Sequence, residues 1–467
     1  MIRKQDILER AREWQLRPEV VEKDYVLGWL LAAIAQHAET SQTWVLKGGT
    51  CVKKCFFETY RFSEDLDFSI LPDGLYSEDP LRDVLREVAD ITSELSGIRF
   101  DMDGIGIRAR VDKLRRTTFE GKIGYRGPLE FPGWPRVLFD LTQHEPVIDE
   151  PVLRRIQHPY PDALPADVLV QTYSIEELIA EKTRALYERS RPRDLYDVVF
   201  ILENESRGIN LEHARDVFVE KCAATKLEVP SAHGIVAVVE DAEEVAAEWA
   251  NMLAHQLPQL PPMQGMLVRL ADAILWVDPM PVAVIGGPPP IPARATETIV
   301  APGSAVLWRT EIPLESVRFA GSNRLLIQFV YGGKIRTLEP YSLRRSNRDN
   351  LLLYGWELES MQIKAFDVAK ITQLSTTNRT FSPRYLVECS ASGAVDTSIP
   401  TSAPRVHRAI RRNPGRARPS GPIYVFVCPA CQREFRHQRN DPLLRRHKVD
   451  PSGSYCPGRR GYLNRTE

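Results

Sequence analysis

Over the first 255 residues, hydrophobic positions follow helical spacing in some segments and form short strand-like runs in others. An apolar run at residues 26–34 lies in a predicted helix, and residues 175–188 repeat apolar side chains at helical spacing. Short strands are predicted at residues 43–46, 66–70 and 136–142. The pattern therefore predicts an α/β (α+β) first domain, which we place at residues 1–257.

The pattern changes after this first domain. A proline-rich linker that contains a short helix at residues 267–276 is predicted at residues 258–305, because nine prolines between positions 258 and 292 cannot sustain a helix or a central strand throughout. Short apolar strands then predict a small β domain at residues 306–389, with a Gly-Gly hairpin turn. An Arg/Pro/Ser-rich linker at residues 390–422 and a basic module at residues 423–467 follow.

Composition excludes several classes of protein. Hydrophobic residues make up 43% and charged residues 26% of the 467 positions, which is not the composition of a disordered chain. No apolar run reaches the ~18 residues that a membrane helix needs, and the N-terminus lacks the apolar core of a signal peptide. We therefore expect a cytoplasmic protein with no membrane association, whose seven cysteines are thiols or metal ligands.

The net charge of -1 conceals an uneven distribution. From Thr401 onward the chain has 15 Lys and Arg against 4 Asp and Glu, so a basic tail follows an acidic body. Such a tail suits contact with the phosphates of a nucleic acid. The alternative is a solvated tail with no partner.

Two short blocks carry the strongest candidate chemistry. Residues 47–50 read Lys-Gly-Gly-Thr after a predicted strand, where glycines let the backbone approach a phosphate and the next helix offers free N–H groups. Asp65 and Asp67 lie two positions apart in the following predicted strand, so their carboxylates share one face. Such a pair requires a cation, and Mg²⁺ (or Mn²⁺) would bind nucleotide phosphates there and support phosphoryl transfer.

The Gly-Gly pair followed by Asp-x-Asp resembles the DNA polymerase β-like nucleotidyltransferase superfamily. With Glu-Lys-Asp-Tyr at residues 22–25 and Arg-Phe-Ser-Glu-Asp-Leu-Asp at residues 61–67, the string is similar to the AbiEii (type IV toxin) family within it. The resemblance covers roughly residues 1–255 and implies a polymerase β-like domain with a helical C-terminal part. A downstream block of that family is matched at residues 181–197.

The downstream block and a later strand supply further candidates. Lys182 could neutralise triphosphate charge as a point cation. Asp194 and Asp197 are three apart on one helical face; Asp194 is either functional or part of a helix-start ion pair with Arg193, and Asp197 supports the site or is structural. Asp140 could accept a proton from the incoming hydroxyl or complete the metal shell, and the alternative is an edge-strand aspartate.

The resemblance thus implies a set of site residues. Those expected in catalysis are Asp65, Asp67, Asp140, Lys182 and Asp194, with Asp65 and Asp67 as the magnesium ligands. Those expected to contact the nucleotide are Lys47, Gly48, Gly49, Thr50, Ser63, Arg184 and Asp197.

The activity implied by the resemblance is transfer of a nucleoside monophosphate from an NTP to an RNA acceptor, with tRNA the expected class. The biological role implied is that of a toxin in a type IV toxin–antitoxin pair acting against phage infection, with an antitoxin protein as partner. The alternative is a regulatory protein that binds nucleic acid or nucleotides and keeps the transferase fold only as a scaffold. Two acids beside a Gly-Gly loop favour the enzyme, because a scaffold does not need them.

The predicted β domain contains Arg-x-Leu-Glu-Pro-Tyr at residues 336–341, which resembles a WYL domain, a small Sm-like β-barrel of bacterial regulators. The resemblance implies a nucleic-acid or nucleotide-like ligand, with Arg336, Tyr341 and Arg384 as candidate contacts. The family's Trp-Tyr-Leu signature is replaced here by Leu-Tyr-Gly-Trp. The alternative is that Tyr341 and its aromatic neighbours Tyr354 and Trp356 are core residues.

The last module has the spacing of a zinc site. Cys428 and Cys431 are three apart after a predicted strand, and the run Cys-x2-Cys-x3-Phe followed by Leu-x2-His copies most of a C2H2 finger. His447 and Cys456 would complete a tetrahedral structural Zn²⁺ site, with His437 competing for the histidine position. The alternative is a disordered basic tail with incidental thiols.

Overall fold

The computed structural model describes residues 1–111, 115–166, 168–204, 208–279, 288–292, 298–299, 310–390, 424–428, 434–437, 444 and 462–466. The chain divides into two compact units, residues 1–400 and 401–467, and each is described separately. In the described segments no helix has both the length and the apolar character to cross a membrane.

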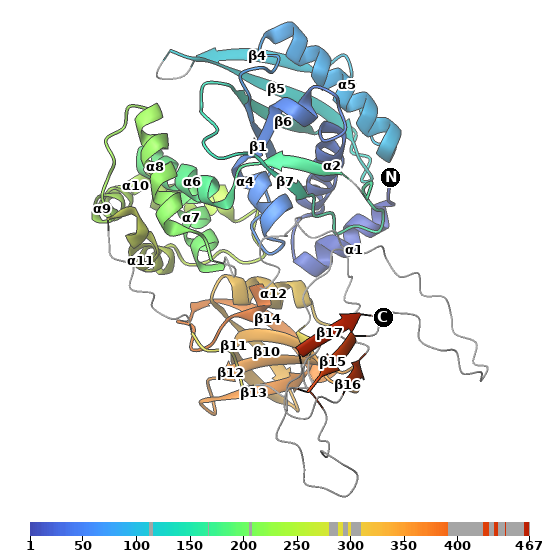
Figure 1. Ribbon diagram of the computed structural model, residues 1–467, viewed down its shortest axis with the longest axis vertical. Coiled ribbons are helices and arrows are strands. Elements are labelled where there is room, and N and C mark those ends of the chain that lie inside the picture. Colours follow the sequence, from blue (N-terminus) through green and yellow to red (C-terminus); the bar gives the residue numbers. More distant parts are fainter. Residues whose placement is uncertain are drawn as a thin grey trace, which may run out of the picture. The chain divides into compact units, whose positions relative to one another are not determined.

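An eight-stranded sheet forms the centre of the transferase-like part of the first unit (Figure 1). Its order is β3-β5-β6-β2-β1-β8-β7, and β4 pairs with β5. The strands are β1 (Trp44–Lys47), β2 (Asp65–Ile70), β3 (Arg99–Phe100), β4 (Gly106–Val111), β5 (Thr117–Arg126), β6 (Arg136–Thr142), β7 (Val152–Arg155) and β8 (Leu169–Thr172). The three strands predicted from the sequence are confirmed as β1, β2 and β6.

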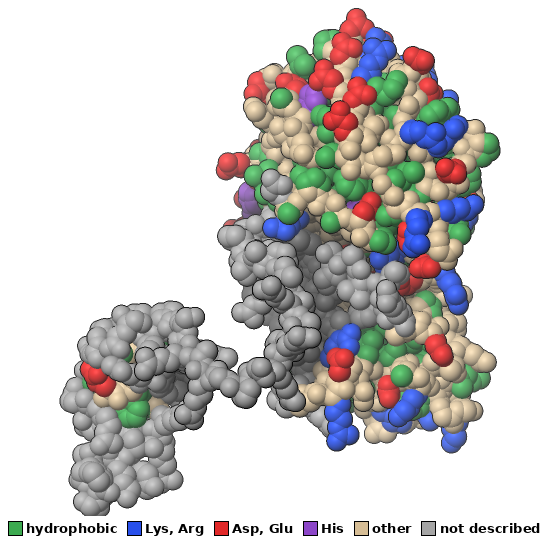
Figure 2. Space-filling model, turned by 90° about the vertical axis from the view of Figure 1, so that its right-hand side faces the viewer, with side chains coloured by type: hydrophobic (Ala, Val, Ile, Leu, Met, Phe, Trp, Pro, Cys, Tyr) green, Lys and Arg blue, Asp and Glu red, His purple; other side chains and the backbone are tan. Residues whose placement is uncertain are grey.

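Three helices belong to the N-terminal half of this sheet: α1 (Lys4–Trp14), α2 (Pro18–Ile34) and α5 (Glu78–Ser96). Apolar side chains surround α2 on almost every side, so it is buried along most of its length. By contrast α5 is amphipathic, and its apolar stripe packs against β4 and β5. The face shown in Figure 2, which includes α5, carries many acidic side chains at its upper end.

Short helical elements flank β1. The turn α3 (Thr40–Thr43) precedes it, and α4 (Gly48–Cys51) followed by a π-helical turn (Val52–Phe56) leads from β1 toward β2. A helix therefore begins directly at the predicted glycine pair.

A helical part follows the sheet. It comprises α6 (Ile175–Arg189), α7 (Pro192–Asn204), α8 (Leu211–Ala224), α9 (Ala232–Asp241), α10 (Glu243–Leu253), α11 (Met263–Ala273) and a 3-10 turn (Ile274–Val277). Ser174 caps α6 by accepting a hydrogen bond from the Glu177 amide, and Pro192 opens α7 where its missing N–H costs nothing. The predicted helix at residues 175–188 is confirmed as α6, whereas α11 lies inside the segment predicted to be a linker.

A second sheet and one helix complete the first unit. The sheet order is β13-β12-β11-β10-β14, with β9 pairing with β11. The elements are β9 (Thr298–Ile299), α12 (Leu314–Ser322), β10 (Leu325–Tyr331), β11 (Lys334–Arg345), β12 (Leu351–Glu357), β13 (Gln362–Asp367) and β14 (Ile371–Thr380), with 3-10 turns at Val368–Lys370 and Glu388–Ser390. The predicted Gly-Gly hairpin is confirmed between β10 and β11. Because β13 and β14 do not pair with each other in the described segments, closure into an Sm-like barrel is not confirmed.

The second unit contains a three-stranded sheet of order β16-β15-β17: β15 (Tyr424–Val427), β16 (Glu434–His437) and β17 (Tyr462–Thr466). Of the four predicted zinc ligands, Cys428 is described and buried, directly after β15. Cys431, His447 and Cys456 lie outside the described residues. The zinc module is therefore not confirmed.

Candidate active site

The predicted acidic residues lie side by side on two adjacent strands, β2 and β6, and Lys47 extends this row onto β1. In the strand register Lys47 of β1 is opposite Asp67 of β2, and Asp67 is opposite Asp140 of β6. Asp65 precedes Asp67 by two positions and so shares its face. Since β6 lies between β5 and β2, the alternative of an edge-strand Asp140 is wrong.

Gly48 is placed against the carboxylate of Asp67. Its φ is +72°, and a Cβ atom there would lie 1.9 Å from Asp67 Oδ2. A side chain would therefore be excluded both by the left-handed backbone and by the carboxylate itself. The turn brings the start of α4 directly beside the acidic row.

The other predicted phosphate contacts are more enclosed. Thr50 is buried and its hydroxyl donates to the carbonyl of Asp65, so it holds β2 in place. A Cβ on Gly49 would lie 2.8 Å from Arg61 Nη2 and 2.9 Å from Ser63 Oγ. Gly49 and Ser63 thus pack behind the acidic row, whereas Gly48 faces it.

Burial, together with the proximity of like charges, raises the pKa values of the carboxyls in the row. Burial raises the pKa of Asp67 to about 6, with a further contribution from the Asp140 carboxylate, and the ammonium groups of Lys182 and Lys47 oppose the shift. Burial also raises the pKa of Asp65. The Asp140 carboxyl is partly shielded from water, and its pKa is raised as well. The row therefore favours a bound cation.

Lys182 reaches the site from α6 and is held by α7. Its Nζ lies 2.8 Å from Asp197 Oδ2 and 3.8 Å from Asp194 Oδ1. Asp197 also accepts two hydrogen bonds from Arg61, from Nε at 2.7 Å and from Nη2 at 2.9 Å. Because Asp197 is fully buried between two cations, its pKa is held well below the usual range despite burial. Asp197 therefore positions Lys182.

Asp194 is paired differently from the sequence-based alternative. Arg189, at the end of α6, donates to both of its carboxylate oxygens, at 2.7 and 3.0 Å. Arg193, the expected partner, instead donates to the carbonyl of Met252. Asp194 thus bridges Lys182 and Arg189.

Glu145 is a site residue that no sequence motif indicates. It lies in the segment between β6 and β7, contacts Lys47 through Oε2 and accepts from Arg184 Nη2 through Oε1 at 2.6 Å. Burial disfavours its charge, but Lys47 and Arg184 together lower its pKa to about 2. One carboxylate is therefore shared by two cations that are predicted to contact a nucleotide.

These groups line one open cleft of about 870 Å³. Its walls include Lys47, Gly48, Asp67, Asp140, Lys182 and Arg184, together with Arg116, Glu145, Glu181, Glu188 and Arg189. The structure thus brings six predicted residues into one cleft. Asp65, Gly49, Thr50, Ser63, Asp194 and Asp197 lie beside or behind that wall.

The acidic row offers carboxylate oxygens of the kind that a divalent cation binds. Among the described residues no group of three or more His, Cys, Asp or Glu side chains could hold a metal ion alone. Mg²⁺, however, usually takes one or two protein carboxylates and receives its other oxygens from substrate phosphates and water. Asp65 and Asp67 on one strand face fit that requirement.

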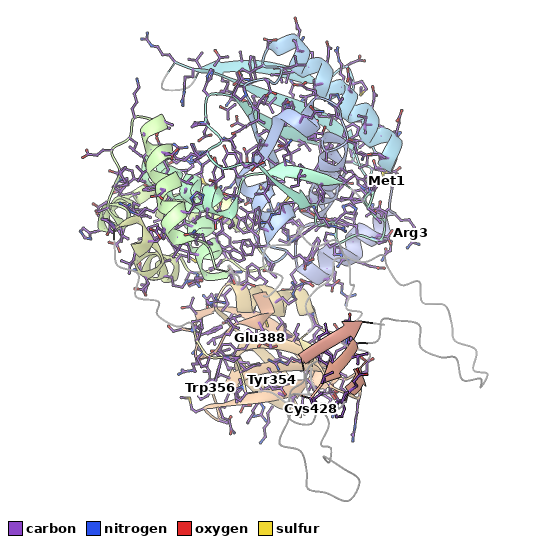
Figure 3. All side chains as sticks on the ribbon, in the orientation of Figure 1. Met1, Arg3, Tyr354, Trp356, Glu388 and Cys428 are labelled. Carbon is purple, nitrogen blue, oxygen red and sulfur yellow. The ribbon has the colours of Figure 1, made fainter. Side chains whose placement is uncertain are left out.

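The candidate residues of the second sheet have partners within that part of the chain. Tyr341 is fully buried, donates to Glu339 at 2.6 Å and accepts from the Arg384 amide at 2.9 Å. Arg336 pairs with Glu357 at 2.8 Å. Arg384 lies over the ring of Trp356, 5.0 Å from its centroid. Trp356 and Tyr354, both labelled in Figure 3, belong to strand β12. Tyr341 therefore supports the core interpretation, and Arg384 is the more accessible residue.

Comparisons with known proteins bear on the first unit. A family model described as nucleotidyl transferase AbiEii toxin, type IV TA system, matches residues 29–276, more than half of the chain. No curated protein matches the chain. Among solved structures, MenT4, a nucleotidyltransferase toxin from Mycobacterium tuberculosis H37Rv, matches with 20% sequence identity and a TM-score of 0.39, covering 60% of this chain and 91% of that one.

Proposed function

The chain belongs to the AbiEii family of nucleotidyl transferase toxins from type IV toxin–antitoxin systems, and we propose that its acceptor is RNA, with tRNA the expected class. It is a nucleotidyltransferase, so an NTP is its substrate, and an antitoxin is its expected partner. The proposal includes dependence on Mg²⁺ (or Mn²⁺), action in the cytoplasm and a role in defence against phage.

The observation that carries this proposal is the row of Asp67 and Asp140 beside a glycine whose Cβ would collide with Asp67. Crowded carboxylates with a raised pKa destabilise an empty site and favour cation binding. The cleft next to them is lined by Lys47, Lys182 and Arg184, which suit a polyphosphate. A scaffold without chemistry has no need of this arrangement.

In this proposal Asp65 and Asp67 hold Mg²⁺, which when bound supplies positive charge to the phosphates. Lys182, positioned by Asp197, lies where it can neutralise the triphosphate. The acceptor hydroxyl oxygen forms a bond to the α-phosphorus, the bond from that phosphorus to the β-phosphate oxygen breaks, and pyrophosphate leaves with the electron pair. Asp140 is placed to take the hydroxyl proton.

The test is transfer of label from each α-labelled NTP to total bacterial RNA. Wild-type protein is compared with Asp65→Ala/Asp67→Ala and with the control Asp79→Ala/Asp83→Ala, which removes two acids from the surface of α5. We expect label in tRNA-sized bands with the wild type and the control only. Label on the protein itself would show that the acceptor is the protein and not RNA. Absence of transfer by protein that still binds RNA would favour the regulatory interpretation.

The C-terminal parts add two separate proposals. Arg336 and Arg384 are proposed to contact a nucleic acid or nucleotide-like ligand of the WYL-like part, whereas the buried Tyr341 is a core residue; Arg384→Ala tests the accessible member. Cys428, Cys431, His447 and Cys456 are proposed to bind a structural Zn²⁺, and metal analysis of purified protein should find about one zinc per chain. Absence of zinc from the purified protein would favour the alternative, a basic tail that binds no metal.

A further inference from the structure

We propose that the open face of the first sheet, over β4, β5 and β6, is the surface on which a single-stranded RNA acceptor lies. The proposal rests on the nucleotidyl-transfer function above and adds the location and chemistry of the acceptor site. We call this surface the arginine face and define it by Arg108, Arg110, Lys122, Arg126, Trp134 and Arg136.

The strand register places the arginine face on the same side of the sheet as the acidic row. Asp140 of β6 is opposite Glu120 of β5, which is opposite Arg108 of β4. Two residues further along the same strands, Asp65 is opposite Leu138, and Leu138 is opposite Lys122. Side chains at directly opposed positions project from the same face. The residues that alternate with these along β5 and β6 are buried on the opposite face of the sheet, where α5 packs.

The arginine face carries accessible positive charge. Arg108, Lys122 and Arg136 are exposed, and no ion-pair partner is found for them among the described residues. Arg110 pairs with Glu120 but keeps 58% of its side chain exposed. Glu120 and Asp101 are the nearby acids on this side, so positive charge exceeds negative charge here. Spaced cations along neighbouring strands suit successive phosphates.

Trp134 gives the surface an exposed aromatic ring. Its side chain is 38% exposed, and the guanidinium of Arg126 lies 4.7 Å from the ring centroid. Gly124 makes room for it, because a Cβ there would lie 3.1 Å from Trp134 Cβ. An exposed aromatic ring beside a guanidinium group is a stacking platform for unpaired bases. This feature favours a single-stranded nucleic acid over an acidic protein.

The position of the arginine face matches the direction from which an acceptor must arrive. Adjacent strands are ~4.8 Å apart, so Arg108 of β4 lies two strands, or about 10 Å, from Asp140, and Lys122 lies on β5, directly beside the strand of Asp140. The nucleotide cleft extends from the row toward Lys182 and Arg184 on α6. A nucleotide from the α6 side and a hydroxyl from the β5 side therefore meet at Asp67 and Asp140.

The first test is a kinetic comparison on the full chain. Arg108→Ala/Lys122→Ala/Arg136→Ala is compared with the control Lys4→Ala/Arg12→Ala/Arg17→Ala, which removes three exposed cations around α1. We expect the first variant to raise KM for RNA about tenfold or more, with KM for NTP unchanged. Loss of three phosphate contacts should also lower the slope of log affinity against log salt by about 2.

The second test locates the RNA directly and does not depend on turnover. A short single-stranded RNA with a photoreactive 3′ nucleotide is crosslinked to wild-type, Trp134→Phe and Trp134→Ala proteins, and the labelled peptides are identified. We expect crosslinks in residues 117–136, retained with phenylalanine and reduced about tenfold with alanine. Crosslinks confined to residues 401–467, or equal KM values in the two triple variants, would overturn the arginine face. Absence of transfer by wild-type protein would instead count against the proposed function.

Discussion

At the scale of single residues, Asp67 is the point where the demands of function and stability conflict. Its pKa of about 6 lies above that of an unfolded aspartate, because burial and the neighbouring Asp140 disfavour the charged form. The folded protein therefore binds the proton more tightly than the unfolded chain does. Stability without metal should fall as the pH rises through roughly 4 to 6, and the full penalty is present above pH 6.

Asp67→Asn should therefore stabilise the metal-free protein. We expect a gain of about 1 to 2 kcal/mol at pH 7.5, less than the full shift implies because the carboxylate is only half-buried. The gain should disappear near pH 4, where the wild-type carboxyl is protonated. Chemical denaturation in EDTA at both pH values measures it.

Added Mg²⁺ supplies the internal control for this prediction. It should stabilise the wild type and leave Asp67→Asn unchanged, because only the wild type retains both metal-binding carboxylates. Asp79→Asn, on the surface of α5, should show neither effect. A destabilised Asp67→Asn at pH 7.5 would mean that the carboxylate is not strained in the absence of metal.

Residues of this site differ in how far the sequence could predict them. The strand position of Asp65 and Asp67 and the glycine beside them follow from local spacing, and the structure confirms that placement. Glu145 and Arg189 could not be predicted. Glu145 contacts Lys47 and Arg184 only after the segment following β6 packs beside β1 and α6, and Arg189 contacts Asp194 only after α6 and α7 pack together. No local sequence pattern predicts these contacts.

At the scale of elements, the segment between β6 and β7 controls the charge of the cleft. Glu145 is the carboxylate of that segment that binds both Lys47 and Arg184. The triphosphate would need those same cations. Glu145 therefore competes with the phosphates for two cleft cations.

Glu145→Gln should bind nucleotide more tightly for this reason. We expect the Kd for pyrophosphate with Mg²⁺, measured by calorimetry, to fall roughly tenfold, or about 1.4 kcal/mol. Glu188→Gln is the matched control, since Glu188 pairs with Arg184 alone and is more exposed. It should change the Kd less than about twofold. Weaker binding by Glu145→Gln would show that Glu145 orients the cations for the phosphates.

Helices and strands were predicted well where the hydrophobic pattern has a single clear period. They were predicted poorly where contacts between distant segments determine the structure. The strands β1, β2 and β6 and helix α6 have strong periodicity and are confirmed. Helix α11 overlaps the short helix predicted at residues 267–276 but begins earlier, at Met263, with Pro262 at its N-cap, where proline is tolerated. The sheet order could not be derived, since it depends on contacts between strands far apart in sequence.

At the scale of the whole first unit, the second sheet is joined to the transferase-like part through α12. Arg318 of α12 lies 3.2 Å from Glu58, and Ser322 contacts Thr59 at 3.0 Å. The hydroxyl of Tyr196 donates to Asn323 at 2.9 Å. Thr59 and Tyr196 are close in sequence to Arg61 and Asp197, which position Lys182. A change in α12 would therefore reach the residues that support the active site.

The apolar core is also continuous across this junction. Buried side chains of α12 and β10, including Leu314, Val317, Phe319 and Leu325, belong to the same cluster as the transferase-like helices. Burial of each contributes about 1.5 to 3 kcal/mol, and the four together approach the ~5 to 15 kcal/mol stability of a typical domain. The modules predicted from the sequence at residues 1–257 and 306–389 therefore share one core, and we do not expect each to be stable when separated from the other.

Truncation tests this continuity. A chain ending at residue 400 keeps the complete first unit, so it should remain soluble and melt within about 3 °C of the full-length protein. A chain ending at residue 305 exposes the apolar surface that α12 and β10 cover, so it should be insoluble or melt at least about 10 °C lower. Thermal denaturation followed by circular dichroism distinguishes these outcomes. A stable chain ending at residue 305 would make the second sheet an accessory that the transferase-like core does not need, because its buried contacts would then contribute nothing net to folding.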